Sequence, residues 1–414
     1  MKRLFIFVFS LILCIPIYQV TPLADETATE TEYSFDSVEF PTLASPFIVV
    51  MDADSGELLY NRNGNTQVHP ASTTKLMTAL LTIENCKMDD VVTYSANAVN
   101  SIEPGFANAS VSEGEELTVK QSLYCLILRS ANEVAYGLAE HVGGSIANFA
   151  RMMNDRAASL GAANTHFSNP SGLTDANHYT SAYDMALIAR ACFNNKALME
   201  IVGYNDTYII GPTNKSRFTR YYKHRYQMMP GGDYAYPYSC GGKTGYTDAA
   251  GNCLVSFAQK DGLRLICVVM NGAEDGRYYD TRALFDYYFN NFHKEFLNES
   301  TLNLPDYIHL DSANYLLVPN GVDFDELIRK MEYSDQYEAF AIANYYYNDT
   351  YVGKMIFSVK PAPENGARGE DIFYINILYV ICGVLGVTAL TLIIIVVSKK
   401  RHRYNNKTTK KLRF

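Results

Sequence analysis

Residues 70–78 read PASTTKLMT and give the strongest indication of both fold and chemistry. Pro70 suits the first turn of a helix, and the apolar pattern continues to about Asn85, so this stretch predicts the start of a helix. Ser72 and Lys75 lie three residues apart and therefore share one helix face. The alternative is a capping serine beside a solvated lysine, which this stretch alone does not exclude.

A serine and a lysine in this arrangement can act as a nucleophile and its base. The helix N-terminus would offer backbone N–H groups to a developing oxyanion. Lys75 must be neutral to accept the Ser72 proton, and burial beside a second cation such as Lys243 would lower the pKa of its amine. The pattern therefore predicts a covalent acyl-enzyme.

A second motif is Ser-Ala-Asn, which occurs at Ser95, Ser130 and Ser312. Only Ser130 lies between two predicted helices of the same domain. There its hydroxyl can relay a proton, and the Asn132 amide can hold a substrate backbone.

The third motif is Lys243-Thr244-Gly245, ahead of strand-like sequence at 251–269. A phosphate-binding loop is excluded because Pro237 stands where that pattern needs glycine and because no helix follows. In an acyltransferase, Lys243 and Thr244 would bind a substrate carboxylate. Gly245 would leave the strand edge open to an extended substrate.

The three motifs resemble the set found in penicillin-recognising enzymes. Three longer stretches resemble the serine-type D-alanyl-D-alanine carboxypeptidases, the low-molecular-mass penicillin-binding proteins: 70–78, 167–173 (FSNPSGL) and 243–251 (KTGYTDAAG). The resemblance covers about residues 41–292 and, more loosely, the segment after it. It implies the penicillin-binding-protein/β-lactamase-like transpeptidase fold, an α/β (α+β) domain with an antiparallel sheet flanked by helices.

The resemblance also implies an activity, removal of the terminal D-alanine from peptidoglycan stem pentapeptides, with β-lactams acylating the same serine. It assigns Ser72 as nucleophile, Lys75 as general base and Ser130 as proton relay. The implied substrate-binding residues are Asn132, Lys243, Thr244, Gly245, Tyr246, Arg225 and Arg277.

Among these, Tyr246 would supply an oxyanion-hole N–H together with Ser72, and the two arginines would assist the carboxylate site. Glu133 departs from the family, which commonly has aspartate there, and this puts the local helix capping in doubt. The tyrosine-rich segment 221–238 would either pack in the core or line the site and stack on sugar or peptide.

Composition limits the partners and cofactors. The net charge of −9 disfavours nucleic acid. The cysteines are irregularly spaced, with no CxxC, HExxH or paired Cys/His set, so we expect no disulfide framework, metal or other cofactor. A hairpin turn at 261–262 would place Cys253 and Cys267 on opposite sheet faces.

Apolar and charged segments predict the domain organisation. Residues 375–397 carry no charge and are long enough to span a bilayer, and the basic tail after them predicts a cytoplasmic end with the catalytic domain on the cell-wall side. The predicted segments are 1–24 (signal peptide), 25–40 (acidic linker), 41–294 (catalytic domain), 295–366 (small all-β domain), 372–398 (transmembrane helix) and 399–414 (cytoplasmic tail).

Two other functions share these motifs. A class A β-lactamase deacylates through a glutamate-activated water, and residues 141–199 contain no glutamate. A β-lactam sensor or idle scaffold would stay acylated and would need a cytoplasmic effector domain, for which residues 399–414 are too few.

Overall fold

The computed structural model describes residues 31–32, 39–100, 102, 105–297, 302, 308–310, 315–333 and 340–359. The predicted signal peptide, transmembrane helix and basic tail lie outside the described residues, and the acidic linker is described only at 31–32 and 39–40. Within the described ranges, no helix is both long enough and apolar enough to cross a bilayer.

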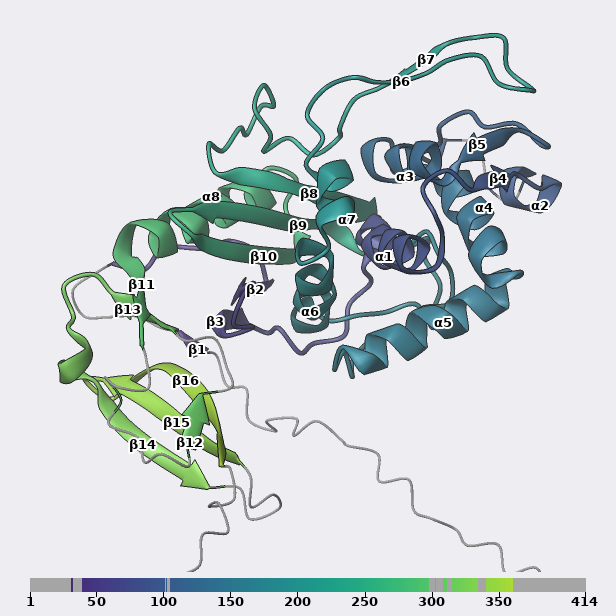
Figure 1. Cartoon of the computed structure of the whole chain (residues 1–414). Coiled ribbons are helices and arrows are strands. Elements are labelled where there is room, and N and C mark those ends of the chain that lie inside the picture. Colours follow the sequence, from purple (N-terminus) through teal and green to yellow (C-terminus); the bar gives the residue numbers. More distant parts are fainter. Residues whose placement is uncertain are drawn as a thin grey trace, which may run out of the picture. The chain divides into compact units, whose positions relative to one another are not determined.

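A six-stranded antiparallel sheet forms the centre of the described chain up to Asn291 (Figure 1). Its strands pair in the order β1 (Thr31–Glu32), β3 (Leu58–Arg62), β2 (Phe47–Asp52), β10 (Leu263–Gly272), β9 (Gly251–Lys260) and β8 (Ser239–Thr247). The predicted turn at 261–262 joins β9 to β10, where Lys260 pairs with Leu263. The sequence therefore predicted this hairpin correctly.

A hydrophobic core covers each face of the sheet. Because successive side chains of a strand point to opposite faces, neighbouring residues of one strand belong to different cores. Val49 and Ile266 belong to one hydrophobic core, whereas Val50 belongs to the other. Cys253 lies in the first core and Cys267 in the second, which confirms the prediction that they occupy opposite faces.

Helices cover the two faces, as the sequence predicted (Figure 1). The helix α8 (Gly276–Asn291) packs on β9 and β10 and contributes Leu284 and Phe285 to the second core. On the other face lie α1 (Lys75–Asn85) and α6 (Ala182–Phe193), with α6 packed on β2 and β10.

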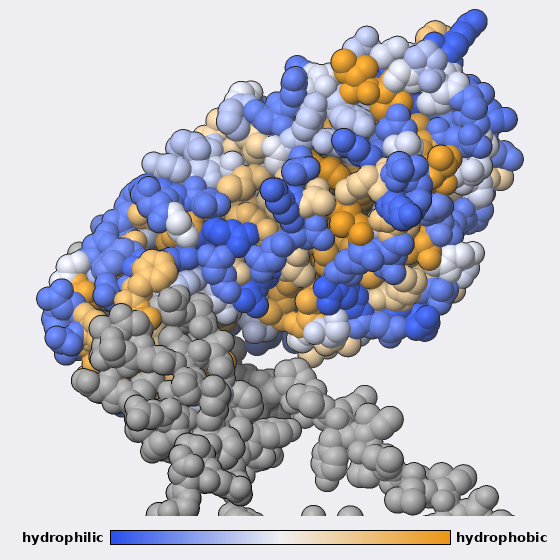
Figure 2. Space-filling view, in the orientation of Figure 1, coloured by the Kyte–Doolittle hydropathy of each residue, from blue (hydrophilic) through white to orange (hydrophobic). Residues whose placement is uncertain are grey.

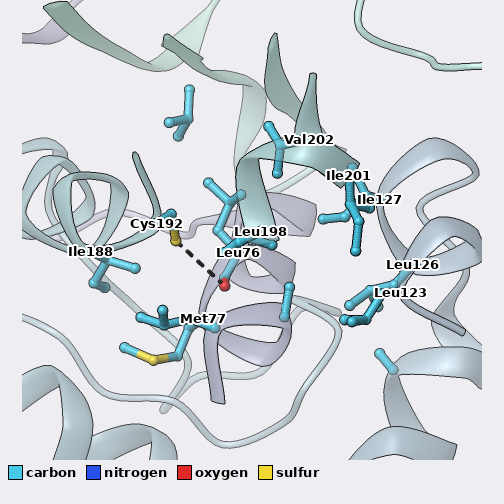
Figure 3. Packing of buried hydrophobic residues seen from close by; sticks show 14 of the residues in the cluster. Leu76, Met77, Leu123, Leu126, Ile127, Ile188, Cys192, Leu198, Ile201 and Val202 are labelled. Atoms are coloured by element: carbon cyan, nitrogen blue, oxygen red, sulfur yellow. Dashed lines mark hydrogen bonds between the residues drawn. The ribbon is translucent and has the colours of Figure 1, made fainter. Parts of the chain in front are cut away.

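The central helix α1 is buried among other helices (Figure 3). Leu76 and Met77 pack in one cluster with side chains from α6, α3 (Val119–Leu128) and α7 (Lys196–Val202). The Cys192 thiol of α6 donates to the Leu76 carbonyl at 3.7 Å. This packing fixes the helix that begins at Lys75.

The remaining helices form the part of the structure around α3. Thr118 caps α3 through a capping box with Gln121, and Ser145 caps α5 (Ile146–Ser159) by accepting from the Asn148 N–H. The other elements here are α2 (Ala96–Asn100), α4 (Asn132–Gly143), β4 (Val91–Thr93) and β5 (Glu116–Thr118).

Beyond Asn291 the described residues are mainly strands. The strand β11 (Phe292–Phe296) pairs with β13 (Tyr315–Pro319). A four-stranded antiparallel sheet, called here the C-terminal sheet, has the order β12 (Ile308–Leu310), β16 (Thr350–Val359), β15 (Phe340–Tyr347) and β14 (Ile328–Tyr333). A short 3₁₀ turn, η2 (Phe324–Glu326), precedes β14.

The tyrosine-rich segment 221–238 contributes three of its six tyrosines to the cores. Tyr222 belongs to the first core, and Tyr226 and Tyr236 belong to the second. Tyr221 is 65% exposed on β7 (Arg220–Tyr222), which pairs with β6 (Tyr208–Ile210). Figure 2 shows hydrophilic residues over much of the visible face, interrupted by apolar patches.

Candidate active site

The first motif lies where a 3₁₀ turn, η1 (Ala71–Thr74), runs into α1. The helix therefore begins as predicted, but its first turn is 3₁₀ rather than α-helical. Ala71 has a positive φ of 47°, and this places Ser72 at the mouth of a cleft with the fully buried Lys75 beneath it.

The Lys75 amine contacts three oxygen atoms. It lies 2.8 Å from Ser72 Oγ, 2.8 Å from Asn132 Oδ1 and 2.6 Å from the Ser171 carbonyl oxygen. The two carbonyl-type oxygens can only accept hydrogen bonds, whereas the Ser72 hydroxyl can also donate. A neutral amine fits this environment, since its two N–H groups satisfy the carbonyls and its lone pair faces the Ser72 proton.

Electrostatics favour this neutral form. Burial lowers the pKa of the Lys75 amine well below 10.5, and the charges of Lys243 and Arg225 lower it further, while Glu133 opposes them. Among the described residues, Lys75 forms no salt bridge with a carboxylate.

The second motif connects α3 to α4, as predicted. Ser130 adopts a positive φ of 58° in this turn, and its Oγ accepts a hydrogen bond from Lys243 Nζ at 3.0 Å. Asn132 is the first residue of α4, and its amide oxygen bonds Lys75. The sharp turn thus directs two side chains of one motif toward two different lysines.

The third motif lies on β8, at the end of the strand order of the described sheet. An added Cβ on Gly245 would lie 2.9 Å from the Ser72 nitrogen, so only glycine lets β8 approach η1 this closely. Lys243 is buried, and burial, followed by the charges of Arg225 and Arg277, lowers the pKa of its amine to about 7.

A cleft of about 790 Å³ brings the predicted residues together. Arg277 donates to Asn252 Oδ1 at 2.8 Å, and its buried Nε has no hydrogen-bond partner among the described residues. Tyr246 is 61% exposed and its hydroxyl donates to Asp248. The predicted residues that line the cleft are Ser72, Ser130, Asn132, Arg225, Thr244, Gly245, Tyr246 and Arg277.

A family model described as D-alanyl-D-alanine carboxypeptidase matches residues 35–274. The chain belongs to this family. It is 36% identical over 230 residues to D-alanyl-D-alanine carboxypeptidase DacF of Bacillus subtilis, covering 54% of this chain and 57% of that protein. It is 32% identical over 262 residues to DacB2 of Mycobacterium tuberculosis, covering 61% of this chain and 85% of that one.

Solved structures agree with this assignment. Penicillin binding protein 6B of Escherichia coli is 26% identical with a TM-score of 0.62, covering 79% of this chain and 99% of that one. A D-alanyl-D-alanine carboxypeptidase of Mycobacterium tuberculosis is 29% identical with a TM-score of 0.56, covering 61% and 94%. The predicted penicillin-binding-protein fold is therefore confirmed, while the chain spans little more than half the length of DacF.

The loop at 167–173 was part of the family resemblance, but the sequence analysis assigned it no role. Asn169 Oδ1 accepts from the N–H groups of Ser171 and Gly172, and this turn presents the Ser171 carbonyl to Lys75. Gly172 has a positive φ of 84°, and an added Cβ would lie 1.8 Å from the Ala71 carbonyl oxygen. The Asn-Pro-Ser-Gly sequence predicts a turn, but nothing in it indicates that the Ser171 carbonyl binds Lys75.

Sequence reasoning also missed His178. Its Nδ1 accepts from the Ser168 N–H at 3.1 Å, so Nε2 carries the proton and donates to Thr74 Oγ1 at 2.9 Å. Burial lowers the pKa of this imidazole to about 4, which keeps it neutral. His178 thus holds the last residue of η1 without touching the cleft.

Glu133, the departure from the family pattern, anchors a cleft-lining loop. Its Oε1 accepts from the Ala109 N–H at 2.6 Å, and burial raises the pKa of its carboxyl. The loop it holds includes Phe106 and Ala107, which line the cleft. The substitution therefore affects a loop contact, and α4 starts at Asn132 without a side-chain cap from Ala131.

Of the tyrosine-rich segment, Arg225 is the residue that lines the cleft. The structure therefore favours the core alternative for the tyrosine rings. Among the described residues, the one group of three metal-ligating side chains lies outside the cleft.

Proposed function

We propose that this chain is a serine D,D-carboxypeptidase that removes the terminal D-alanine from peptidoglycan stem pentapeptides and is acylated by β-lactams. The buried Lys75 amine, placed between Ser72 Oγ and two carbonyl-type oxygens, is the observation that carries the proposal. The activity recorded in the names of its relatives supports the same assignment.

The proposed reaction assigns each residue the role that the family resemblance implies. Ser72 Oγ attacks the carbonyl of the penultimate D-alanine while its proton passes to Lys75. The backbone N–H groups of Ser72 and Tyr246 stabilise the oxyanion, and Ser130 relays a proton to the leaving amine while it regains one from protonated Lys75, which becomes neutral again. Water then attacks the acyl-enzyme and releases the shortened peptide.

Substrate binding uses the cations around the cleft. Lys243, with Thr244, holds the terminal carboxylate, and Arg225 and Arg277 add positive charge beside it. The free edge of β8 receives the extended peptide, and Asn132 holds its backbone amide. No nucleic acid and no cofactor takes part in this scheme.

The test is Ser72→Ala in the purified protein. We expect it to abolish D-alanine release from a stem pentapeptide and labelling by a fluorescent penicillin, whereas the control Ser159→Ala, on the exposed end of α5, retains both. Retained labelling in Ser72→Ala would contradict the proposed nucleophile. Labelling of the parent without D-alanine release would favour the sensor or scaffold instead.

We further propose that the chain is a single-pass membrane protein. Residues 372–398 span the bilayer, 399–414 lie in the cytoplasm, and the catalytic domain and a β domain of residues 295–366 lie on the cell-wall side. The uncharged run at 375–397 and the basic tail support this topology. Protease treatment of intact cells should remove penicillin labelling but spare a C-terminal tag; a protected catalytic domain would contradict it.

A further inference from the structure

Three metal-ligating side chains meet at the C-terminal ends of α1 and α4. Cys86 directly follows the last residue of α1, His141 lies in the last turn of α4, and Asp90 precedes β4. The thiol sulfur, a carboxylate oxygen and an imidazole nitrogen of these residues all lie within 4.8 Å of one another.

These ligand atoms are largely free to bind a cation. Within the described part of the chain, neither the Cys86 thiol nor the His141 ring has a hydrogen bond or an ion pair. Asp90 accepts one hydrogen bond, from the Lys87 N–H to Oδ2 at 2.8 Å. His141 is exposed and the other two are partly buried, so a cation and a water ligand can reach the group.

The chemistry of the donors favours zinc over the hard cations. Thiolate and imidazole are ligands of borderline-soft metals, whereas Ca²⁺ and Mg²⁺ prefer oxygen ligands alone. In a tetrahedral zinc site, with bonds of about 2.0 to 2.3 Å, neighbouring donors lie about 3.5 Å apart. Donors within 4.8 Å of one another therefore need to approach by at most about 1.3 Å, which small side-chain rotations can supply.

We propose that Cys86, Asp90 and His141 bind Zn²⁺, with water as the fourth ligand, and that the ion cross-links the C-terminal ends of α1 and α4. The N-termini of the same two helices carry Lys75 and Asn132, which bond each other at 2.8 Å. One helix pair is thus tied at both ends. Binding releases the thiol proton, because zinc takes thiolate as its ligand.

The proposed zinc site would stabilise the packing of α1 against α4 and would not take part in the chemistry of the cleft. With 11 residues, α1 is about 16 Å long at 1.5 Å per residue, so the ion lies far from Lys75. Cys86 and Asp90 lie four residues apart, but His141 comes from a distant segment, so the sequence contains no local metal-binding motif for the three. This inference does not depend on the proposed function.

The test is metal titration of the full chain, purified in detergent and freed of metal by chelation. Addition of Co²⁺, a zinc substitute, should produce sulfur-to-cobalt charge-transfer absorption at one equivalent, and Zn²⁺ should abolish it. Zn²⁺ should raise the midpoint of thermal unfolding by about 2 °C or more, since it binds the folded chain preferentially. Ca²⁺ at the same concentration should do neither.

Variants identify the ligands. Cys86→Ser should eliminate the charge-transfer absorption, and His141→Gln and Asp90→Asn should weaken Zn²⁺ binding by more than about tenfold. The matched control is Cys240→Ser, because Cys240 is the other partly buried free cysteine among the described residues. It should keep both signals.

The parent protein alone already decides the central point. Absence of thiolate-to-cobalt absorption in the parent would overturn the proposal whether or not any variant folds. Absorption that survives Cys86→Ser but disappears in Cys240→Ser would overturn it equally, as would Ca²⁺ stabilising the chain as strongly as Zn²⁺.

Discussion

Charged side chains have contrasting surroundings in two regions of the molecule. In the cleft, Lys75 and Lys243 are buried and form no salt bridge among the described residues. In the turn between β2 and β3, Asp54 accepts from Lys294 Nζ of β11 at 2.7 Å and from Arg264 Nη1 of β10 at 2.6 Å. We call this second region the junction cluster; its members are Asp52, Asp54, Arg264, Lys294 and Tyr315.

The difference appears in the pKa values. Burial without a bonded carboxylate lowers the pKa of Lys75 well below 10.5 and that of Lys243 to about 7. In the junction cluster, burial raises the pKa of the Asp54 carboxyl, but the bonds from Lys294 and Arg264 outweigh it and hold that pKa below its ordinary value.

This comparison separates reactive groups from structural ones. A buried cation without an anion is costly as a cation and so becomes a neutral amine that can accept a proton. A cation bonded to a carboxylate joins elements together. We therefore propose that the same side-chain type serves as a base in one region and as a cross-link in the other.

The largest effect should come from a lysine that cannot become neutral. Lys75→Arg keeps the charge and should slow acylation by a fluorescent penicillin by about 10³-fold, because the base is lost. The matched change in the junction cluster, Lys294→Arg, preserves the bond to Asp54 and should leave the rate nearly unchanged. If Lys75→Arg were acylated at a rate within tenfold of the parent, the proposed difference between Lys75 and Lys294 would be contradicted.

A smaller decrease in the acylation rate should follow from a change that displaces β8 and retains both lysines. In Gly245→Ala the new Cβ would lie 2.9 Å from the Ser72 nitrogen, so β8 or η1 must shift. Acylation should slow by about 10²-fold, since misplacement of about 1 Å has that cost. The control Gly211→Ala, where an added Cβ meets nothing within 4 Å, should acylate normally.

The smallest effect tests the structural side of the comparison. The Tyr315 hydroxyl donates to the buried Asp52 at 2.7 Å, and Tyr315→Phe removes that donor. The free energy of unfolding should fall by about 1–3 kcal/mol with acylation unchanged. The control Tyr279→Phe alters an exposed ring and should change neither quantity. Slower acylation in Tyr315→Phe would show that the two regions are coupled.

The sequence predicted what is encoded locally. The hairpin at 261–262, the turn at Ser130 and the approach of Lys75 to Ser72 follow from spacing and periodicity along short stretches, whereas the fold was implied by the family resemblance. The family resemblance correctly indicated which distant motifs meet in one cleft. The roles of these residues remain predictions until the variants are measured.

Contacts between distant segments escaped prediction. The Ser171 carbonyl, the His178 ring and the Glu133 carboxylate each bond a residue far away in sequence or in another element. A carbonyl carries no sequence signal, and a buried histidine looks the same whether it binds a hydroxyl or fills a core. The proposed zinc site likewise joins distant segments, because His141 lies far in sequence from Cys86 and Asp90.

The most direct measurement is the pH dependence of acylation of the parent protein by a β-lactam, from about pH 4 to about pH 10. Lys75 acts when neutral, so the rate should fall as pH drops through a pKa well below 10.5. Lys243 binds the carboxylate when charged, so the rate should also fall above its pKa of about 7. A rate that climbs steadily toward pH 10 would show an ordinary lysine at Lys75 and would contradict the account.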